Sequence, residues 1–166
     1  MNVTQLSKNG YVLTDIFDTN ILNRIDELVD TFTPTQIQSD VTARREAYFL
    51  FKDQEFSDEL RKILEFELDS NNIVTCDIVG LELWRDYPGY INPMHTDDPQ
   101  LTSVLIIYLG NNLPNGTEYI EDGKRYYSEY KRNTGLVLLN SNKISHGMIS
   151  KVPDNAIRKT LYINWR

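Results

Sequence analysis

Hydrophobic side chains recur at spacings of three and four residues in two segments of the first part of the chain, and each pattern predicts an amphipathic helix. The first helix is predicted at about residues 21–32, with Asp18 or Thr19 as its N-cap. Its apolar face consists of Ile21, Leu22, Ile25, Leu28, Val29 and Phe32. The second helix is predicted to begin with Ser57 as its N-cap. Its apolar stripe consists of Leu60, Ile63, Leu64 and Leu68.

From about residue 73 onward, β-branched and aromatic segments alternate with turn residues, which predicts strands. Those strands are expected at 73–86, 101–109, 118–120, 124–130, 135–139, 144–151 and 159–164, and two more at 11–14 and 48–51. Helices followed by many short strands are typical of an α+β domain in which the sheets form a sandwich or jelly roll. We therefore predict one domain over residues 1–166, in which residues 1–72 are mainly helical support and residues 73–166 form a β core that carries the site.

The composition narrows the class of protein. The chain has 166 residues and a net charge of −7. Because phosphate backbones repel an acidic protein without a basic stripe, we do not expect nucleic acid as a partner. No apolar run approaches the roughly 20 residues of a membrane-spanning helix, and the N-terminus lacks signal-peptide character. The single cysteine, Cys76, is expected to pack in the core, and its isolation suits a cytoplasmic location without membrane association. The composition gives no indication of the oligomeric state.

A candidate metal site centres on His95 and Asp97. Side chains two residues apart in extended chain point the same way, so both can reach one ion. The only other histidine is His146, 51 residues after His95. Two histidines and one carboxylate from separate strands are the ligands of non-haem Fe(II) oxygenases and leave other coordination positions open. A zinc site or a purely structural site is the alternative.

Arg158 follows in a predicted strand whose alternation places Arg158 and Thr160 on one face. The opposite face consists of Leu161, Ile163 and Trp165. A buried arginine needs an anionic partner, and its planar guanidinium suits a carboxylate. That partner is either an aspartate or glutamate of the protein or a ligand. Two tryptophans, Trp84 and Trp165, are expected in the core rather than at a substrate site.

Residues 81–165 resemble the Fe(II)/2-oxoglutarate-dependent dioxygenases, in particular the prolyl 4-hydroxylase-like branch. The segments that carry the resemblance are, in chain order, Tyr87-Pro-Gly89, His95-x-Asp97, Ile107-Tyr108-Leu109, Gly116-Thr-Glu118, His146-Gly147 and Arg158-x-Thr160. The fourth segment has one glycine fewer than the family's Gly-Gly-Glu-Thr. The front part of the chain shows no motif of the family, so the resemblance informs on the cosubstrate more than on the substrate.

The resemblance implies a double-stranded β-helix, or jelly-roll, core with the N-terminal helices packed on one sheet. It implies a catalytic Fe(II) bound by His95, Asp97 and His146. It assigns the cosubstrate 2-oxoglutarate to four residues. Arg158 is expected to bind the distal carboxylate, helped by Tyr108 and Thr160, and Tyr87 is expected to face the metal-bound end. Dioxygen is the second cosubstrate, and the protein supplies orientation and a dry pocket.

The resemblance also suggests a substrate, namely a prolyl residue in a peptide or protein, hydroxylated at an unactivated C–H bond. Two alternatives stay open. One is the same chemistry on a free small molecule such as an amino acid, and the other is a non-catalytic jelly-roll protein that binds a metal. The tyrosine-rich segment 111–133 is too long for a plain connection and predicts a hairpin, either exposed or forming a lid or wall of the substrate site.

Overall fold

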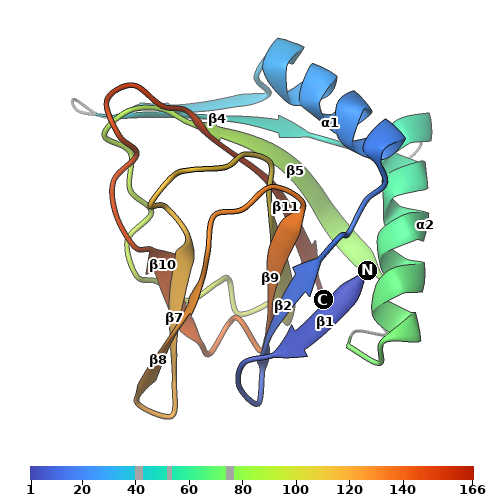
Figure 1. Cartoon of the computed structure of the whole chain (residues 1–166), viewed down its shortest axis with the longest axis vertical. Coiled ribbons are helices and arrows are strands. Elements are labelled where there is room, and N and C mark those ends of the chain that lie inside the picture. The colour runs from blue at the N-terminus through green and yellow to red at the C-terminus, as the bar shows by residue number, and fades with distance from the viewer. Residues whose placement is uncertain (40–42, 52–53, 74–76) are drawn as a thin grey trace.

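The computed structural model describes residues 1–39, 43–51, 54–73 and 77–166, so the expectation for Cys76 lies outside the described residues. This part of the chain contains two helices and eleven strands, and the strands form two antiparallel sheets (Figure 1). The elements are β1 (Asn2–Gln5), β2 (Gly10–Thr14), α1 (Thr19–Thr31), β3 (Gln36–Ser39), β4 (Arg44–Phe49), α2 (Glu55–Ser70), β5 (Ile78–Asp86), β6 (Ser103–Tyr108), β7 (Thr117–Glu121), β8 (Lys124–Ser128), β9 (Thr134–Leu139), β10 (Ser145–Met148) and β11 (Arg158–Trp165).

The large sheet has eight strands in the order β1-β2-β9-β6-β11-β5-β4-β3, and the small sheet has three in the order β10-β7-β8. Several neighbours in the large sheet are far apart in sequence, since β11 pairs with both β5 and β6 and β9 pairs with β2. In Figure 1 the small sheet lies on one side of the large sheet and the helices lie toward the other. This mostly β architecture agrees with the predicted jelly-roll class.

The two helices differ in how well the sequence predicted their starts. In α1, the Asp18 side chain accepts a hydrogen bond from the amide of Ile21 at 2.9 Å, which confirms the predicted cap. The predicted cap of α2 is wrong. This helix begins after Gln54, and Ser57 lies inside it, fully buried, where its hydroxyl donates to the carbonyl of Leu50. Because a serine hydroxyl can bond to nearby backbone in several ways, its presence alone does not mark a helix start.

The main core joins both helices to one face of the large sheet. Buried residues of α1 and α2 lie in one hydrophobic cluster with buried residues of β5, β6 and β11. The members from β11 are Leu161, Ile163 and Trp165, which confirms the predicted alternation of that strand. The opposite face of β11 carries Arg158, Thr160 and Tyr162, which border a cavity shared with the small sheet. The large sheet therefore separates an apolar core from a polar interior.

The front of the chain is more than helical support, because it also supplies four strands of the large sheet. The sequence did not predict β1 and β3, and it placed β4 at 48–51 instead of Arg44–Phe49. All four residues of β3 are exposed, and β3 lies at the edge of the sheet. An exposed edge strand needs no apolar alternation, since backbone pairing alone defines it.

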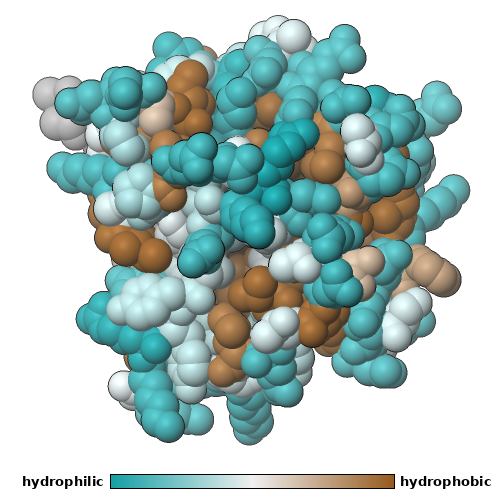
Figure 2. Space-filling model, viewed as in Figure 1, coloured by the Kyte–Doolittle hydropathy of each residue, from teal (hydrophilic) through white to brown (hydrophobic). Residues whose placement is uncertain are grey.

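On the face drawn in Figure 2, hydrophobic side chains reach the surface in separate groups among hydrophilic ones. Exposed large hydrophobic residues include Phe66 of α2, Ile37 of β3 and Phe51, which follows β4. No helix in the described part of the chain has the length and apolar character needed to cross a membrane.

Candidate active site

A local pairing of backbones brings the two histidines together. The amide of His95 donates to the carbonyl of His146 at 2.9 Å, and the amide of His146 donates back at 2.8 Å. His95 thereby forms an isolated antiparallel bridge with β10 of the small sheet. Directly opposed residues in an antiparallel pair have neighbouring side chains, and the two imidazole centroids are 4.6 Å apart.

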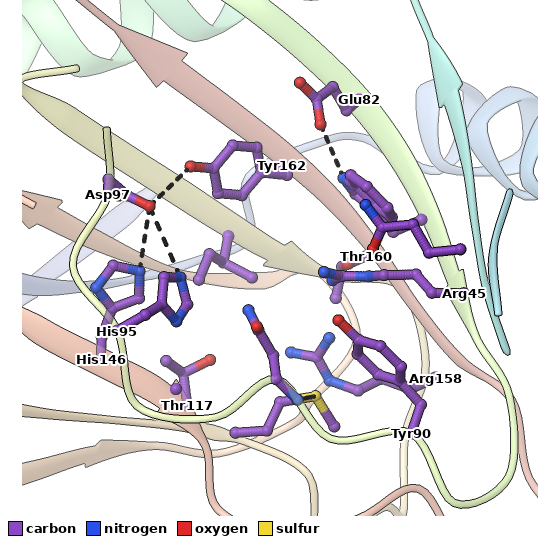
Figure 3. Close-up of a pocket in the computed structure, with 16 residues that line it drawn as sticks. Arg45, Glu82, Tyr90, His95, Asp97, Thr117, His146, Arg158, Thr160 and Tyr162 are labelled. Carbon is purple, nitrogen blue, oxygen red and sulfur yellow. Dashed lines mark hydrogen bonds and ion pairs between the residues drawn. The ribbon is translucent and has the colours of Figure 1, made fainter. Parts of the chain in front are cut away.

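Backbone carbonyls orient both imidazole rings. The Nδ1 atom of His95 lies 2.7 Å from the carbonyl oxygen of Pro93, and Nδ1 of His146 lies 3.0 Å from that of Ile144. A proton on Nδ1 satisfies each of these contacts and leaves the Nε2 lone pair free. A hydrogen bond of this kind from the distal ring nitrogen commonly fixes a metal-binding histidine. Both Nε2 atoms point toward Asp97 (Figure 3).

Asp97 completes a compact set of potential ligands. Its Oδ1 lies 3.8 Å from Nε2 of His95 and 3.7 Å from Nε2 of His146, and the three ligand atoms lie within 4.8 Å of one another. The Tyr162 hydroxyl donates to the same Oδ1 at 3.4 Å. The other oxygen, Oδ2, is buried without a hydrogen-bond partner among the described residues. An unsatisfied buried carboxylate oxygen is costly, and a cation at this position would remove that cost.

The electrostatics favour a neutral His146. Burial lowers the pKa of His146, and the nearby His95 adds to this effect, whereas the negative charge of Asp97 opposes it. The imidazole must be unprotonated to bind a metal. Burial also raises the pKa of Tyr162, and the charge of Asp97 raises it further, so this phenol keeps its proton and acts as a donor.

The ligand set opens onto a cavity of about 360 Å³ between the two sheets (Figure 3). Residues of β5, β6 and β11 form one wall, and residues of β7 and β10 contribute the other. Arg158 and Thr160 both line this cavity, so the structure joins these two sequence-predicted residues to the triad. His95 lies toward the outside, with 35% of its side chain exposed, whereas the His146 side chain is 3% exposed.

Arg158 has a protein partner as well as access to the cavity. Its Nη1 donates to Oδ2 of Asp86 at 2.9 Å, and its Nε donates to the carbonyl oxygen of Asn115 at 3.0 Å. The sequence left open whether Arg158 pairs with a carboxylate of the protein or with a ligand. The structure shows a protein partner, and it is Asp86. A second arginine, Arg45 of β4, donates from Nε to the other oxygen of Asp86 at 2.7 Å. One buried carboxylate thus serves two guanidinium groups.

Tyr108 and Tyr87 do not line the cavity. The Tyr108 hydroxyl is fully buried, donates to Oγ1 of Thr117 at 2.8 Å and contacts the hydroxyl of Ser128. The Tyr87 hydroxyl donates to Oε2 of Glu46 at 2.8 Å. The Tyr87 hydroxyl is therefore engaged away from the cavity. Tyr108 does not line the cavity but contacts two residues that do, because its hydroxyl donates to Thr117 and the Arg158 guanidinium lies 5.8 Å from its ring centroid.

Several residues of the cavity were not singled out from the sequence. Glu82 and Trp84 lie on β5, and Trp84 borders the cavity instead of the core, contrary to expectation. Their positions follow from strand alternation, because Leu81 and Leu83 face the core. Tyr162 likewise continues the alternation of Arg158 and Thr160. Tyr90 had no comparable signal, since it reaches the cavity from a loop, and Arg45 reaches it through the pairing of β4 with β5.

Glu82 is a half-buried acid on the cavity wall. Its Oε2 accepts a hydrogen bond from the indole nitrogen of Trp84 at 3.0 Å. Burial raises the pKa of Glu82, although this hydrogen bond and the charge of Arg45 act in the opposite direction.

The predicted hairpin in the tyrosine-rich segment is β7–β8, where Thr117 borders the cavity and Tyr127 is exposed. The first strand of the hairpin, β7, thus contributes to the wall of the cavity, and most of the second strand, β8, is exposed to solvent.

Comparisons with known proteins match this geometry at the level of the fold. No family model matches the chain, and no curated protein matches its sequence. A Pseudomonas putida prolyl-4-hydroxylase aligns with a TM-score of 0.69 at 14% identity, over 95% of this chain and 92% of that one. A Trichoplax adhaerens prolyl hydroxylase, in complex with a hypoxia inducible factor oxygen degradation domain peptide fragment, gives 0.71 at 12% identity, over 96% and 84%.

A third structure, HygX from Streptomyces hygroscopicus with nickel and 2-oxoglutarate bound, gives a TM-score of 0.71 at 8% identity, over 95% of this chain and 82% of that one. The chain therefore has the jelly-roll fold of the prolyl hydroxylases and other 2-oxoglutarate/Fe(II) oxygenases. The resemblance noted in the sequence is confirmed at the level of the fold.

Proposed function

We propose that this protein is an Fe(II)- and 2-oxoglutarate-dependent dioxygenase that hydroxylates an unactivated C–H bond. The observation that carries the proposal is the convergence of two Nε2 atoms and a carboxylate, in which Asp97 Oδ2 is buried without a partner among the described residues. Redox-active Fe(II) suits this mixed set of imidazole and carboxylate ligands. Nickel and 2-oxoglutarate in the structurally similar HygX support the same cofactor pair.

In this proposal His95, Asp97 and His146 hold Fe(II), and Arg158 holds the distal carboxylate of 2-oxoglutarate. Together with dioxygen, the bound cofactors supply the oxidation, in which 2-oxoglutarate becomes succinate and CO2 and one oxygen atom enters the substrate. The protein contributes the geometry. Backbone carbonyls hold the two imidazoles, and the Tyr162 hydroxyl donates to Asp97. Such outer contacts keep ligands oriented before the metal arrives.

The cavity also limits water around the reacting groups. Thr160 and Ile106 both line the cavity, and Thr160 is buried whereas Ile106 is half-buried. A buried wall strengthens the charge-assisted contacts of the cosubstrate, because the local dielectric constant is low. Orientation and desolvation are the contributions that a protein makes to cofactor chemistry of this type.

For the substrate we propose a prolyl residue presented by a peptide or protein. Two structural neighbours are prolyl hydroxylases, and one of them was solved with a peptide fragment. The partly exposed side chain of His95 supports a larger substrate, because a residue of a peptide can approach the metal ligands from that side. Hydroxylation of a free amino acid and metal binding without catalysis are the competing functions.

The decisive experiment is an anaerobic titration of the metal-free protein with Fe(II) and 2-oxoglutarate, recorded by visible absorption. We expect a metal-to-ligand charge-transfer band that is lost in His146→Ala. If the wild-type protein binds Fe(II) without this band, the dioxygenase proposal fails and a metal-binding jelly-roll protein becomes the better description.

A matched pair of variants tests the ligand set by turnover. Asp97→Ala should abolish iron-dependent succinate formation, because it removes one ligand and one negative charge. Asp98→Ala is the control, since Asp98 is adjacent and exposed and its carboxylate accepts from the amide of Gln100. Full activity in Asp97→Ala would contradict the triad. Proline-containing peptides and free proline, compared by mass for an added oxygen atom, then distinguish the two substrate classes.

A further inference from the structure

Asp86 lies between two arginines on three neighbouring strands. In the register of the large sheet, Asp86 of β5 pairs with Arg45 of β4 on one side and with Arg158 of β11 on the other. The Asp86 side chain is 0% exposed, against 15% for Arg45 and 3% for Arg158. Each arginine contacts a different oxygen of the carboxylate. This group therefore contains one buried cation, one partly buried cation and one buried anion.

The remaining carboxylates of the cavity do not balance this charge by contact. Among the described residues, neither Glu82 nor Asp97 forms an ion pair with Arg45 or Arg158. The Glu82 carboxylate accepts a hydrogen bond from the Trp84 indole, and in Figure 3 Asp97 lies beside His95 and His146. A desolvated cation without a counter-ion is costly, so this end of the cavity favours an anionic ligand.

Both guanidinium groups have donors left for such a ligand. Arg45 uses Nε for Asp86, and its guanidinium lies 4.0 Å from the ring centroid of Trp84 and 4.8 Å from that of Tyr90. Arg158 uses Nε and Nη1. Arg45 also interacts with the Tyr90 hydroxyl. For Arg158, no hydrogen bond from Nη2 is seen within the described chain, and none of the terminal nitrogens of either arginine is buried without a partner. Both side chains border the cavity.

We propose that Arg45 and Arg158 together bind the distal carboxylate of 2-oxoglutarate, and that Asp86 holds the two guanidinium groups side by side for this purpose. The inference rests on the proposed function and adds Arg45 as a second cosubstrate anchor. A ligand carboxylate can accept one hydrogen bond from each arginine, just as the Asp86 carboxylate accepts one from each. With the ligand bound, two positive charges face two negative ones. The β3–β4 part of the chain thus contributes directly to cosubstrate binding.

The test compares two 2-oxo acids that differ only at the distal end. 2-Oxoglutarate carries the distal carboxylate, and 2-oxopentanoate has a methyl group in its place. Calorimetric titration of the anaerobic Fe(II) protein gives a dissociation constant for each acid. In Arg45→Gln, we expect the affinity for 2-oxoglutarate to fall roughly ten- to hundredfold, as for the loss of a charge-assisted hydrogen bond, and the affinity for 2-oxopentanoate to change less than about twofold.

The matched control is Arg44→Gln, because Arg44 is the preceding residue, has an exposed side chain paired with Glu46, and does not border the cavity. It removes the same charge from the same strand and should leave both affinities within about twofold. Equal weakening of both acids by Arg45→Gln would overturn the inference, since it would indicate a change of cavity shape.

Unchanged binding of 2-oxoglutarate in Arg45→Gln, with weaker binding of the substrate, would also overturn it and assign Arg45 to the substrate. These outcomes differ from a failure of the proposed function, in which the wild-type protein would not bind 2-oxoglutarate at all.

Discussion

Replacing Asp86 by asparagine tests the buried charge cluster most directly. The substitution keeps the shape of the side chain and removes the only carboxylate that contacts both Arg45 and Arg158 among the described residues. In the variant, an amide NH2 group replaces one of the two carboxylate oxygens, so one guanidinium faces a hydrogen-bond donor instead of an acceptor. The variant therefore leaves the buried Arg158 and the partly buried Arg45 without the carboxylate that they share.

The magnitude follows from the burial of the three groups. Removing one partner of a buried ion pair typically costs about 3–5 kcal/mol, and Asp86 is fully buried with both arginines largely enclosed. This is a large part of the roughly 5–15 kcal/mol that stabilises an ordinary domain. For a chain of this length, about 1 kcal/mol corresponds to roughly 2–4 °C in Tm, so Asp86→Asn should lower Tm on the order of 10 °C.

The assay is urea unfolding of the metal-free protein, which avoids a contribution from ligand binding to the folded state. Asp30→Asn is the control, because Asp30 pairs with Lys159 at the surface and its side chain is 54% exposed. That variant should stay within about 1 kcal/mol of wild type. If Asp86→Asn also stays within this range, the two arginines do not depend on Asp86 and the reasoning about the charge cluster is wrong.

Three further predictions use other contacts of the site. Arg158→Ala should weaken 2-oxoglutarate binding by roughly tenfold or more, measured by calorimetry, because a buried charged contact is lost. Tyr108→Phe should lower the free energy of unfolding by about 1–2 kcal/mol, since its buried hydroxyl contacts two neighbouring hydroxyl groups. The same variant should bind 2-oxoglutarate as wild type does, and a large loss of affinity would restore Tyr108 to the site. The third prediction concerns Glu46, where burial alone would raise the pKa, but a tyrosine hydroxyl and two arginines lower it below 4.5. The stabilisation is present above about pH 4.5 and is lost as the pH falls through the lowered pKa, so Glu46→Gln should destabilise the protein at pH 7 and have little effect near pH 2 in pH-dependent urea unfolding.

The sequence determined the parts of this protein that depend on local periodicity. The apolar face of α1 and its Asp18 cap followed from spacing, and so did the division of β11 into a core face and a cavity face. Such patterns can be found locally, because burying one face requires the same spacing whatever the partner is. The Ser57 cap failed because a serine hydroxyl has several backbone partners within reach.

The tertiary structure decided which distant residues meet. The pairing of His95 with His146 turns two isolated histidines into one site with Asp97, and the pairing of β4 with β5 brings Arg45 to Asp86. Neither contact leaves a local trace, because the register between strands depends on the whole sheet and on its edges. For the same reason, the sequence did not predict the exposed strand β3 or the hydroxyl partners of Tyr108. Alternation along each strand is a property of the chain, whereas the choice of neighbour across strands belongs to the folded molecule.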